Sequence, residues 1–140
     1  MRLFKNRKYK SGSRWSIWRW TDVDPLNNNK IYLTRLHLVQ TPWWSVMLHW
    51  INLPDPQEDM HDHPVNFLSI ILSGGYTEET PNGIKERRFF NLIRSSDRHR
   101  IISLKKPTLT LAIAGKVVHS WGFWTSRGFV PWRQYNHDAT

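Results

Sequence analysis

The most informative stretch of the sequence is His61-Asp62-His63-Pro64. It is followed by an apolar run at 65–72 and by Ser-Gly-Gly at 73–75. In an extended segment, side chains at positions i and i+2 point to the same side. His61 and His63 can therefore converge on one metal ion, for which neutral imidazole is the commonest side-chain ligand. The apolar run predicts a strand that continues from the histidine pair, and we expect the double glycine to turn the chain back.

Short apolar segments with alternating polarity recur after residue 13, and turn residues separate them. The Pro-Asn-Gly sequence at 81–83 is a strong hairpin signal. We predict strands at 14–20, 31–39, 45–53, 65–72, 76–80, 85–92, 99–104, 108–114, 120–125 and 129–135, and no helix. About ten short strands with turns between them are typical of a β-sandwich or barrel, so the sequence predicts an all-β fold.

The composition limits the class of protein. A chain of 140 residues is most simply one domain, and we expect a basic N-terminal arm at 1–13 and a barrel domain at 14–140. The sequence has no cysteine, so disulfides and thiolate ligands are excluded and any metal must be held by His, Asp, Glu or water. The lack of cysteine fits a cytoplasmic protein at least as well as a secreted one, and we expect neither a signal peptide nor a membrane span.

The chain is basic and rich in tryptophan. Its net charge is +9, from 20 basic and 11 acidic residues. Such a field attracts phosphates, acidic metabolites or nucleic acid, although a basic surface alone also explains the count. The nine tryptophans must mostly pack in the core or at the rim, but a few could stack a flat ring such as a nucleobase.

The histidine stretch resembles the first motif of the cupin superfamily, Gly-x5-His-x-His-x3-4-Glu-x6-Gly. His61, His63 and Gly74 match it, whereas Phe67 stands where the family has its glutamate. The second motif, Pro-x-Gly-x2-His, is matched only by His99 at the end of residues 94–99, inside the usual distance from the first. The chain after Lys30 also looks like small cupin-like proteins of phage and bacterial genomes.

The resemblance implies a double-stranded β-helix, the cupin or jelly-roll barrel, and a divalent metal such as Fe, Zn, Mn or Ni on His61, His63 and His99. His99 opens a predicted strand after a polar turn, which can bring its ring to the same barrel mouth. Thiol dioxygenases of the superfamily hold Fe(II) with three histidines and no carboxylate, and Phe67 is consistent with that set or with loss of the metal. Homodimers are common in the superfamily. A phage-encoded protein would act in the cytoplasm of the bacterial host.

Other residues are candidates for the site. Glu78, with Tyr76 on the same face, is the best carboxylate for general acid–base chemistry, unless it is a solvated hairpin residue. Arg88 and Arg100 could bind a phosphate or carboxylate, although alternation leaves half of the nearby arginines on the surface. Asp62 points away from the two histidines and is expected to be a supporting or turn residue.

Two further histidines and two tryptophans complete the candidate ligand-binding set. His49 is either a fourth inward group or a core histidine, and His119 competes with His99 for the third ligand position. Trp50 and Trp121 flank these histidines and could pack the flat part of a ligand.

Three functions remain open at this point. The first is a metal-dependent cupin enzyme, a hydrolase or oxygenase, acting on a small anionic ligand such as a nucleotide or phosphorylated messenger. The second is a protein that sequesters such a ligand without turnover, for example a nucleotide signal of host immunity against phage. The third is a nucleic-acid-binding protein that uses the basic arm, whose affinity would fall steeply with salt.

Overall fold

The computed structural model describes residues 18–24, 28 and 30–138, which form two antiparallel sheets and a short helix. The larger sheet contains seven strands and the smaller one three. The elements are β1 (Trp18–Asp24), β2 (Lys30–Gln40), β3 (Trp44–Ile51), β4 (Met60–His61), β5 (Phe67–Thr80), β6 (Gly83–Arg87), β7 (Phe90–Ile93), β8 (Arg100–Gly115), β9 (Gly122–Thr125), β10 (Gly128–Pro131) and α1 (Trp132–Asp138). The predicted all-β class is confirmed, while the predicted arm at 1–13 lies outside the described residues.

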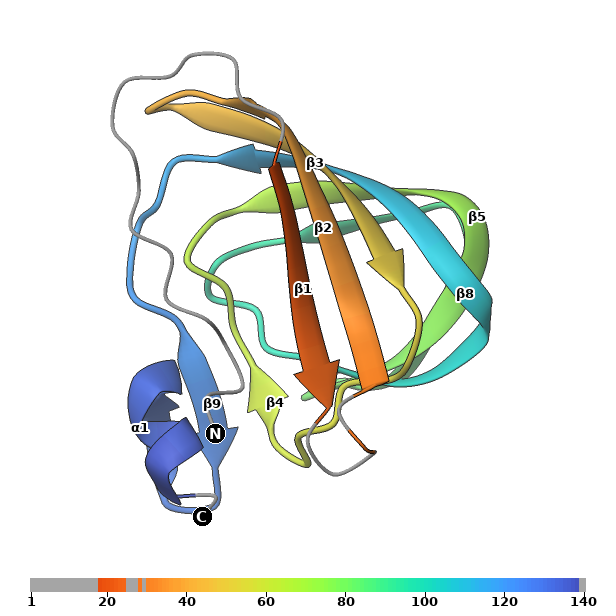
Figure 1. The fold of residues 1–140 in the computed structure, drawn as a ribbon. Coiled ribbons are helices and arrows are strands. Elements are labelled where there is room, and N and C mark those ends of the chain that lie inside the picture. The colour runs from red at the N-terminus through yellow and green to blue at the C-terminus, as the bar shows by residue number, and fades with distance from the viewer. Residues whose placement is uncertain (1–17, 25–27, 29, 139–140) are drawn as a thin grey trace.

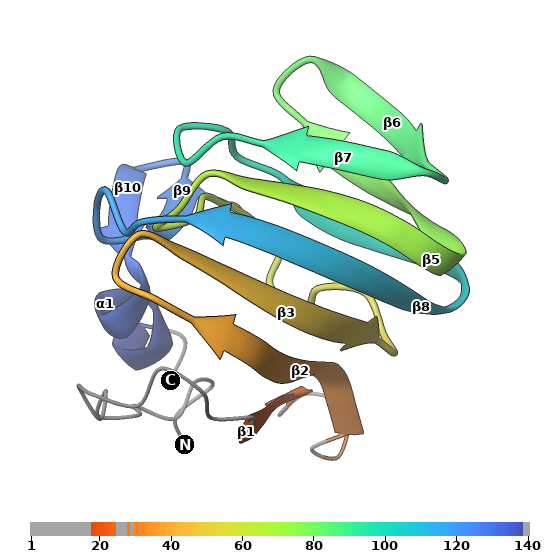
Figure 2. The ribbon, with the colours of Figure 1, turned by 90° about the horizontal axis from the view of Figure 1, so that it is seen from above.

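The long strands β5 and β8 form the centre of the larger sheet. They pair antiparallel from Phe67 opposite Ala114 to Glu79 opposite Arg100. The free edge of β5 is covered by β7 in its first half and by β6 in its second half. On the other side, β3, β2 and β1 follow β8 in order (Figure 2). Both long strands curve strongly, so the sheet wraps toward the smaller sheet β10-β9-β4 (Figure 1).

The double glycine does not turn the chain back, so that prediction is wrong. β5 runs through Gly74 and Gly75 as one strand, with register shifts against β8 on both sides of Gly75. Thr108 fastens this bend, because its hydroxyl accepts a hydrogen bond from the Gly75 N–H at 3.0 Å and lies 2.9 Å from the Lys106 carbonyl. The two strands predicted on either side of residues 105–107 are likewise one strand, β8. These irregularities bend the strands without ending them.

The predicted strand at 129–135 is also wrong in its second half. β10 ends at Pro131 and the helix α1 follows. Trp132 stacks on Trp121 with ring centroids 5.8 Å apart, and Tyr135 stacks on Phe123 at 3.9 Å. Residues three apart share one face of a helix, so a helical turn places both rings against β9 and the segment before it. The only helix in the described part of the chain has seven residues, far fewer than a bilayer span requires.

The prediction for residues 85–92 joined two strands that the structure separates. β6 ends at Arg87 and β7 begins at Phe90, each paired with a different half of β5. The remaining predicted strands from residue 31 onward correspond to strands of the structure within a few residues at their ends. The strand predicted at 14–20 is described only from Trp18, and it extends to Asp24, where a turn was expected.

The inner face of the larger sheet changes from apolar to polar along the strands. At one end, buried Ile51, Ile71 and Tyr76 pack against partly buried Leu33, Ile101 and Leu104. The interior also contains fully buried polar side chains, among them Ser69, Glu78, Asn91 and Thr110. An interior with this much polar character is unusual for a structural core and points to a site inside the barrel.

Replacement of Gly74 by alanine tests the bend in β5. Gly74 has a φ of +90°, and an added Cβ would lie 2.5 Å from the Thr108 hydroxyl and 3.0 Å from its Cα. We expect Gly74→Ala to lower the free energy of unfolding in urea by about 2–3 kcal/mol. The matched control is Gly83→Ala, where φ is +110° but no atom lies within 4 Å, so only backbone strain of about 1 kcal/mol applies. Equal losses in both variants would contradict the close packing at Gly74.

Candidate metal centre

Backbone pairing brings the first and third histidines together. His61 lies at the end of β4 and forms an isolated antiparallel bridge with His99, just before β8. The His61 N–H donates to the His99 carbonyl at 2.9 Å, and the His99 N–H donates to the His61 carbonyl at 3.0 Å. His63 follows two residues later in extended chain. This bridge fixes the relative position of two segments that are distant in sequence.

The three imidazole rings face one another. Ring centroids lie 4.9 Å apart for His61 and His63, and 5.0 Å apart for each of these with His99. One ring nitrogen from each residue lies within 4.8 Å of the other two. The prediction that His61 and His63 point to the same side is therefore confirmed, and the structure brings His99 to them.

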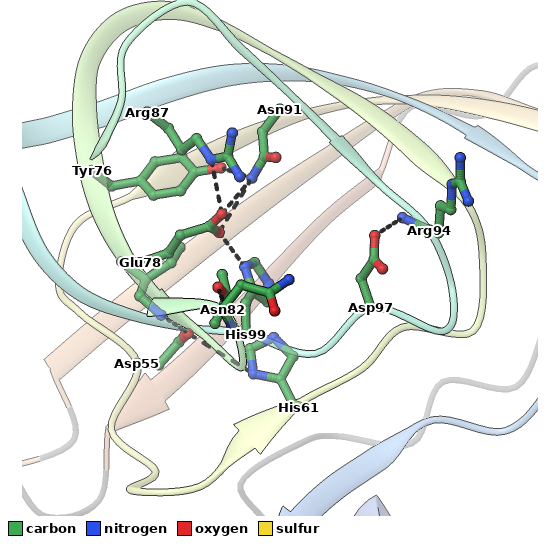
Figure 3. Close-up of polar contacts among 12 residues, drawn as sticks. Asp55, His61, Tyr76, Glu78, Asn82, Arg87, Asn91, Arg94, Asp97 and His99 are labelled. Atoms are coloured by element: carbon green, nitrogen blue, oxygen red, sulfur yellow. Dashed lines mark hydrogen bonds and ion pairs between the residues drawn. The ribbon is translucent and has the colours of Figure 1, made fainter. Parts of the chain in front are cut away.

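A buried carboxylate orients the ring of His99. The Nδ1 atom of His99 lies 2.6 Å from a carboxylate oxygen of Glu78, which is only 2% exposed. The other Glu78 oxygen accepts a hydrogen bond from Arg87 Nε at 2.8 Å. Asn91 donates to Glu78 at 3.2 Å and also lies 3.0 Å from the Tyr76 hydroxyl (Figure 3). Because Nδ1 of His99 is held by Glu78, its Nε2 is directed to the other two rings.

Burial favours the neutral form of His61 and His63. It lowers the pKa of His61 from 6.5 to about 4, and it lowers the pKa of His63 well below the usual value with a further contribution from His61. Burial alone would raise the pKa of Glu78, but the hydrogen bonds and charges of His99 and Arg87 outweigh it and lower the pKa. At neutral pH, His61 and His63 are thus neutral, which is the form of imidazole that binds metals.

The three histidines fit a divalent transition metal. An ion about 2.0–2.1 Å from two imidazole nitrogens holds them at most about 4.2 Å apart, so the nitrogens, within 4.8 Å of one another, need only small ring rotations. The Nδ1 atom of His63 is buried and has no hydrogen-bond partner among the described residues. A buried ring nitrogen without a hydrogen-bond partner, in a cluster of imidazoles, fits a set of metal ligands.

Aromatic and acidic side chains surround the three clustered histidines. Phe67, at the position of the cupin glutamate, packs edge-on against His63 with centroids 4.9 Å apart. The Trp121 ring lies 6.1 Å from that of His61. On the other side, a carboxylate oxygen of Asp55 lies 3.9 Å from Nδ1 of His61 and accepts the Ile101 N–H at 2.8 Å. The Asp55 carboxylate thus lies near the three histidines but is not one of the clustered metal-ligand candidates.

Asp62 has the supporting position that was expected of it. Its side chain is buried away from the cluster and accepts hydrogen bonds from the Gly122 N–H at 2.9 Å and from Trp124 Nε1 at 3.3 Å. It therefore fastens β9 to the segment that carries His61 and His63.

The other predicted site residues lie in different surroundings. His119 contacts the carbonyls of Ser120 at 2.8 Å and Ser95 at 3.0 Å, which raise its pKa, so it is tied to loops outside the cluster. His49 faces the interior from β3, and burial, followed by the charge of Arg35, lowers its pKa to about 3. Its Nε2 is buried without a partner among the described residues, and it is not one of the three clustered histidines.

The predicted arginines and the remaining aromatic candidate lie away from the rings. Arg88 is exposed and pairs with Glu86 at 3.2 Å, while Arg100 contacts the Glu58 carbonyl at 2.8 Å and Glu79 at 3.1 Å. Trp50 is exposed on the outer side of β3.

Sequence reasoning missed Arg87, Asn91 and Asp55. Arg87 lies opposite Tyr76, and Asn91 opposite Ser69, in the strand registers. The sequence offers a faint signal for the first two, because alternation within 85–92 would have shown that Arg87 and Asn91 share one face. The break at Arg88 and Phe89 hid which arginine faces inward.

An open cleft of about 320 Å³ adjoins His99 and Glu78. It lies between the β5–β6 hairpin and the loop before β8. Its rim contains Asn82, Lys85, Ser96 and Arg98, and the Arg98 guanidinium lies 4.7 Å from the centroid of a Trp124 ring. The volume is at the lower end of those of small-molecule sites.

Comparisons with known proteins show which solved structures have a similar architecture. No protein-family model matches the chain, and no curated protein matches its sequence. Among solved structures, a cupin-2 domain protein from Rhodospirillum rubrum shares 12% identity over 88% of this chain and 86% of its own, with a TM-score of 0.61. Streptomyces PAC13 (Y89F) with uridine shares 11% identity over 92% and 98%, with a TM-score of 0.55. The Fe(II) form of HppE shares 11% over 77% and 62%, with a TM-score of 0.53.

The curved antiparallel strands, with three facing histidines at the end of β4 and just before β8, form an all-β barrel. The structural neighbours identify its fold as that of the cupins, as the resemblance of the histidine motif implied.

Stability of the metal-free protein should depend on pH through the buried histidines. The unfolded chain, with histidine pKa values near 6.5, binds more protons than the folded protein down to about pH 4 for His61 and about pH 3 for His49. Stability therefore falls as the pH falls from 6.5 through these values, by on the order of 3 kcal/mol for each histidine.

Urea unfolding of chelator-treated protein between pH 7 and 4 measures this dependence. His49→Gln, which removes one titrating group outside the cluster, should make the curve shallower. A free energy of unfolding that is constant across this range would show that the histidines are not buried as described.

Proposed function

We propose that this cupin-fold protein is metal-dependent and acts on a small anionic ligand, with nucleotides as the favoured class. The observation that carries the proposal is the convergence of three imidazole rings, with His99 hydrogen-bonded to Glu78. A divalent ion on His61, His63 and His99 would supply a Lewis acid that polarises a ligand oxygen or activates a water molecule or O2.

The chain's own residues have distinct parts in this proposal. Glu78 keeps the His99 ring in one tautomer and orientation, as carboxylates do for metal-binding histidines. Because three donors already engage it, we favour this positioning part for Glu78 over the general acid–base part suggested by the sequence. Tyr76 supports the same network through Asn91. Lys85 and Arg98 bring positive charge to the cleft beside His99, where the anionic group of a ligand would bind.

The nucleotide class rests on the cleft and on one structural neighbour. The cleft contains Lys85 and Arg98, whose charges suit a phosphate. PAC13, which has the same fold, is seen with uridine. Capture of a nucleotide without turnover is the second candidate, and the orphaned His63 nitrogen favours the metal-dependent function over it. An oxygenase with Fe(II) on three histidines is the third, and Phe67 in place of a carboxylate ligand is consistent with it.

Elemental analysis of the purified protein tests the metal. We expect about one divalent transition-metal ion per chain, lost in both His61→Ala and His99→Ala. Glu78→Gln should keep the ion with about 10–100-fold weaker affinity, because it no longer orients His99 as strongly. His119→Ala is the matched control and should retain the full content. A folded wild-type protein without metal, or metal retained in both histidine variants, would refute the metal-dependent function.

Titration with AMP and UMP tests the ligand class. We expect Lys85→Ala and Arg98→Ala each to weaken binding of the monophosphates about tenfold, with a smaller effect on adenosine and uridine, because the lost contact is to the phosphate. Lys105→Ala, on β8 outside the cleft, is the control for net charge. Binding that resists both substitutions would exclude the cleft, and binding that resists a chelator would favour capture without a metal.

A further inference from the structure

The helix α1 carries two aromatic side chains, Trp132 and Tyr135, that lie outside the candidate metal centre. The helix lies against β9, which pairs with β4, the strand that ends at His61 (Figure 1). A helix of seven residues is too short to be stable alone in water, so it exists because of what it packs against. Both aromatic side chains stack on rings that in turn contact one of the three clustered histidines.

Tyr135 reaches His61 through Phe123. The rings of Tyr135 and Phe123 are stacked, with centroids 3.9 Å apart and planes at 21°. Phe123 is only 1% exposed, and its ring centroid lies 6.0 Å from that of His61 in an edge-on arrangement. The backbone reinforces this contact, because Phe123 is the strand partner of His61 in the pairing of β9 with β4. Phe123 therefore links the helix to the histidine.

Trp132 reaches the same histidine through Trp121. The two indole rings are stacked, with centroids 5.8 Å apart and planes at 9°, and the Trp132 N–H donates to the Trp121 carbonyl at 3.2 Å. The Trp121 ring lies 6.1 Å from the His61 ring and 5.6 Å from that of Phe123. We call Trp121 and Phe123 the aromatic wall. Both members of the aromatic wall contact His61, and α1 packs on both of them.

A hydrogen bond ties the helix to the segment that leads into β4. The Tyr135 hydroxyl donates to a carboxylate oxygen of Asp59 at 3.1 Å. Burial, followed by the negative charge of Asp59, raises the pKa of Tyr135 to about 12, so the hydroxyl keeps its proton at neutral pH. Asp59 precedes His61 by two residues. The helix thus holds both the backbone before His61 and the rings beside it.

His61 and His99 differ in what orients their rings. Nδ1 of His99 is held by Glu78 at 2.6 Å, the kind of contact that usually orients a metal-binding histidine. For His61, the Asp55 carboxylate lies 3.9 Å from Nδ1, which is beyond hydrogen-bond distance. Edge-on packing against an aromatic ring is favourable and depends on orientation, so the aromatic wall can orient His61 where a hydrogen bond does not.

We propose that Trp132 and Tyr135 are positioning residues of the candidate metal centre, which hold the His61 ring in its ligating orientation through the aromatic wall. This inference rests on the proposed function, because it requires the three histidines to hold a metal ion. The apolar shell around a metal site also controls the access of solvent. Loosening of α1 should therefore weaken metal binding and speed the loss of the ion.

Competition titration with Zn²⁺, together with the rate of zinc loss to a chelator, tests the proposal. We expect Trp132→Ala and Tyr135→Ala each to weaken zinc binding about tenfold and to speed zinc loss, as changes outside the direct ligands commonly do. Trp132→Phe keeps an aromatic ring on Trp121 and should recover most of the affinity. Tyr135→Phe keeps the stack but loses the bond to Asp59, so its affinity should be intermediate. These two phenylalanine variants carry the test if an alanine variant does not fold.

Two control variants separate positioning from stability. Gln134→Ala changes an exposed residue of the same helix and should bind zinc as the wild type does. Ile51→Val removes one methylene from the apolar end of the barrel, so it should lower the free energy of unfolding without weakening zinc binding. With Co²⁺ as the probe, the visible absorption bands report the coordination geometry. They should change in Trp132→Ala, return in Trp132→Phe and stay the same in Ile51→Val.

The possible outcomes distinguish this proposal from the proposed function. A folded wild-type protein that binds no zinc or cobalt would refute the proposed function, and this inference would fall with it. A wild type that binds zinc, with equal affinity in Trp132→Ala and Tyr135→Ala, would overturn this inference alone. Equal losses of affinity in Ile51→Val and in the two helix variants would overturn it as well, because they would reflect stability and not the orientation of His61.

Discussion

The contact between His99 and Glu78 is the interaction on which the candidate site depends. Glu78 comes from the far half of β5, beyond the glycine bend, and His99 lies just before β8. Their 2.6 Å contact therefore requires the two long strands to be in register after the irregularities at Gly74 and Gly75. His61 is then held beside His99 by backbone hydrogen bonds. The site is thus held to the rest of the fold by the Glu78–His99 contact and by the backbone bridge between His61 and His99.

Part of the larger sheet has polar side chains on its inner face and apolar side chains on its outer face. A barrel that only had to be stable would bury its leucines and expose its serines and histidines. Here the inner face contains Ser69, Glu78, Asn91 and Thr110, and the outer face contains rows of leucine, isoleucine and phenylalanine. Both departures cost stability in a monomer. A site in the interior accounts for the polar inner face.

The sequence predicted the class of fold and the core of the site, but not its supporting residues. Alternation and turn residues were sufficient for an all-β fold, and an extended i, i+2 spacing was sufficient to bring His61 and His63 to one side. The predicted chain reversal at the double glycine was wrong, because glycine permits a bulge as readily as a turn. Pairing with the partner strand decides between the two. Asp55 and Arg87 could not be assigned, because their contacts depend on register across strands distant in the sequence. The helix at Trp132 likewise depends on rings of β9 and the preceding segment that the local pattern does not contain.

The absence of a carboxylate from the histidine set has an electrostatic consequence for the proposed ligand. Phe67 fills the position of the cupin glutamate, and the negative charge of Glu78 reaches the cluster only through the His99 ring. Three neutral imidazoles would leave the full charge of a divalent ion uncompensated by its direct ligands. Such an ion attracts an anion more strongly than one already bound to a carboxylate, and Lys85 and Arg98 act in the same direction from the cleft. The phenylalanine at the glutamate position and the cations of the cleft thus both agree with the negatively charged ligand of the proposed function.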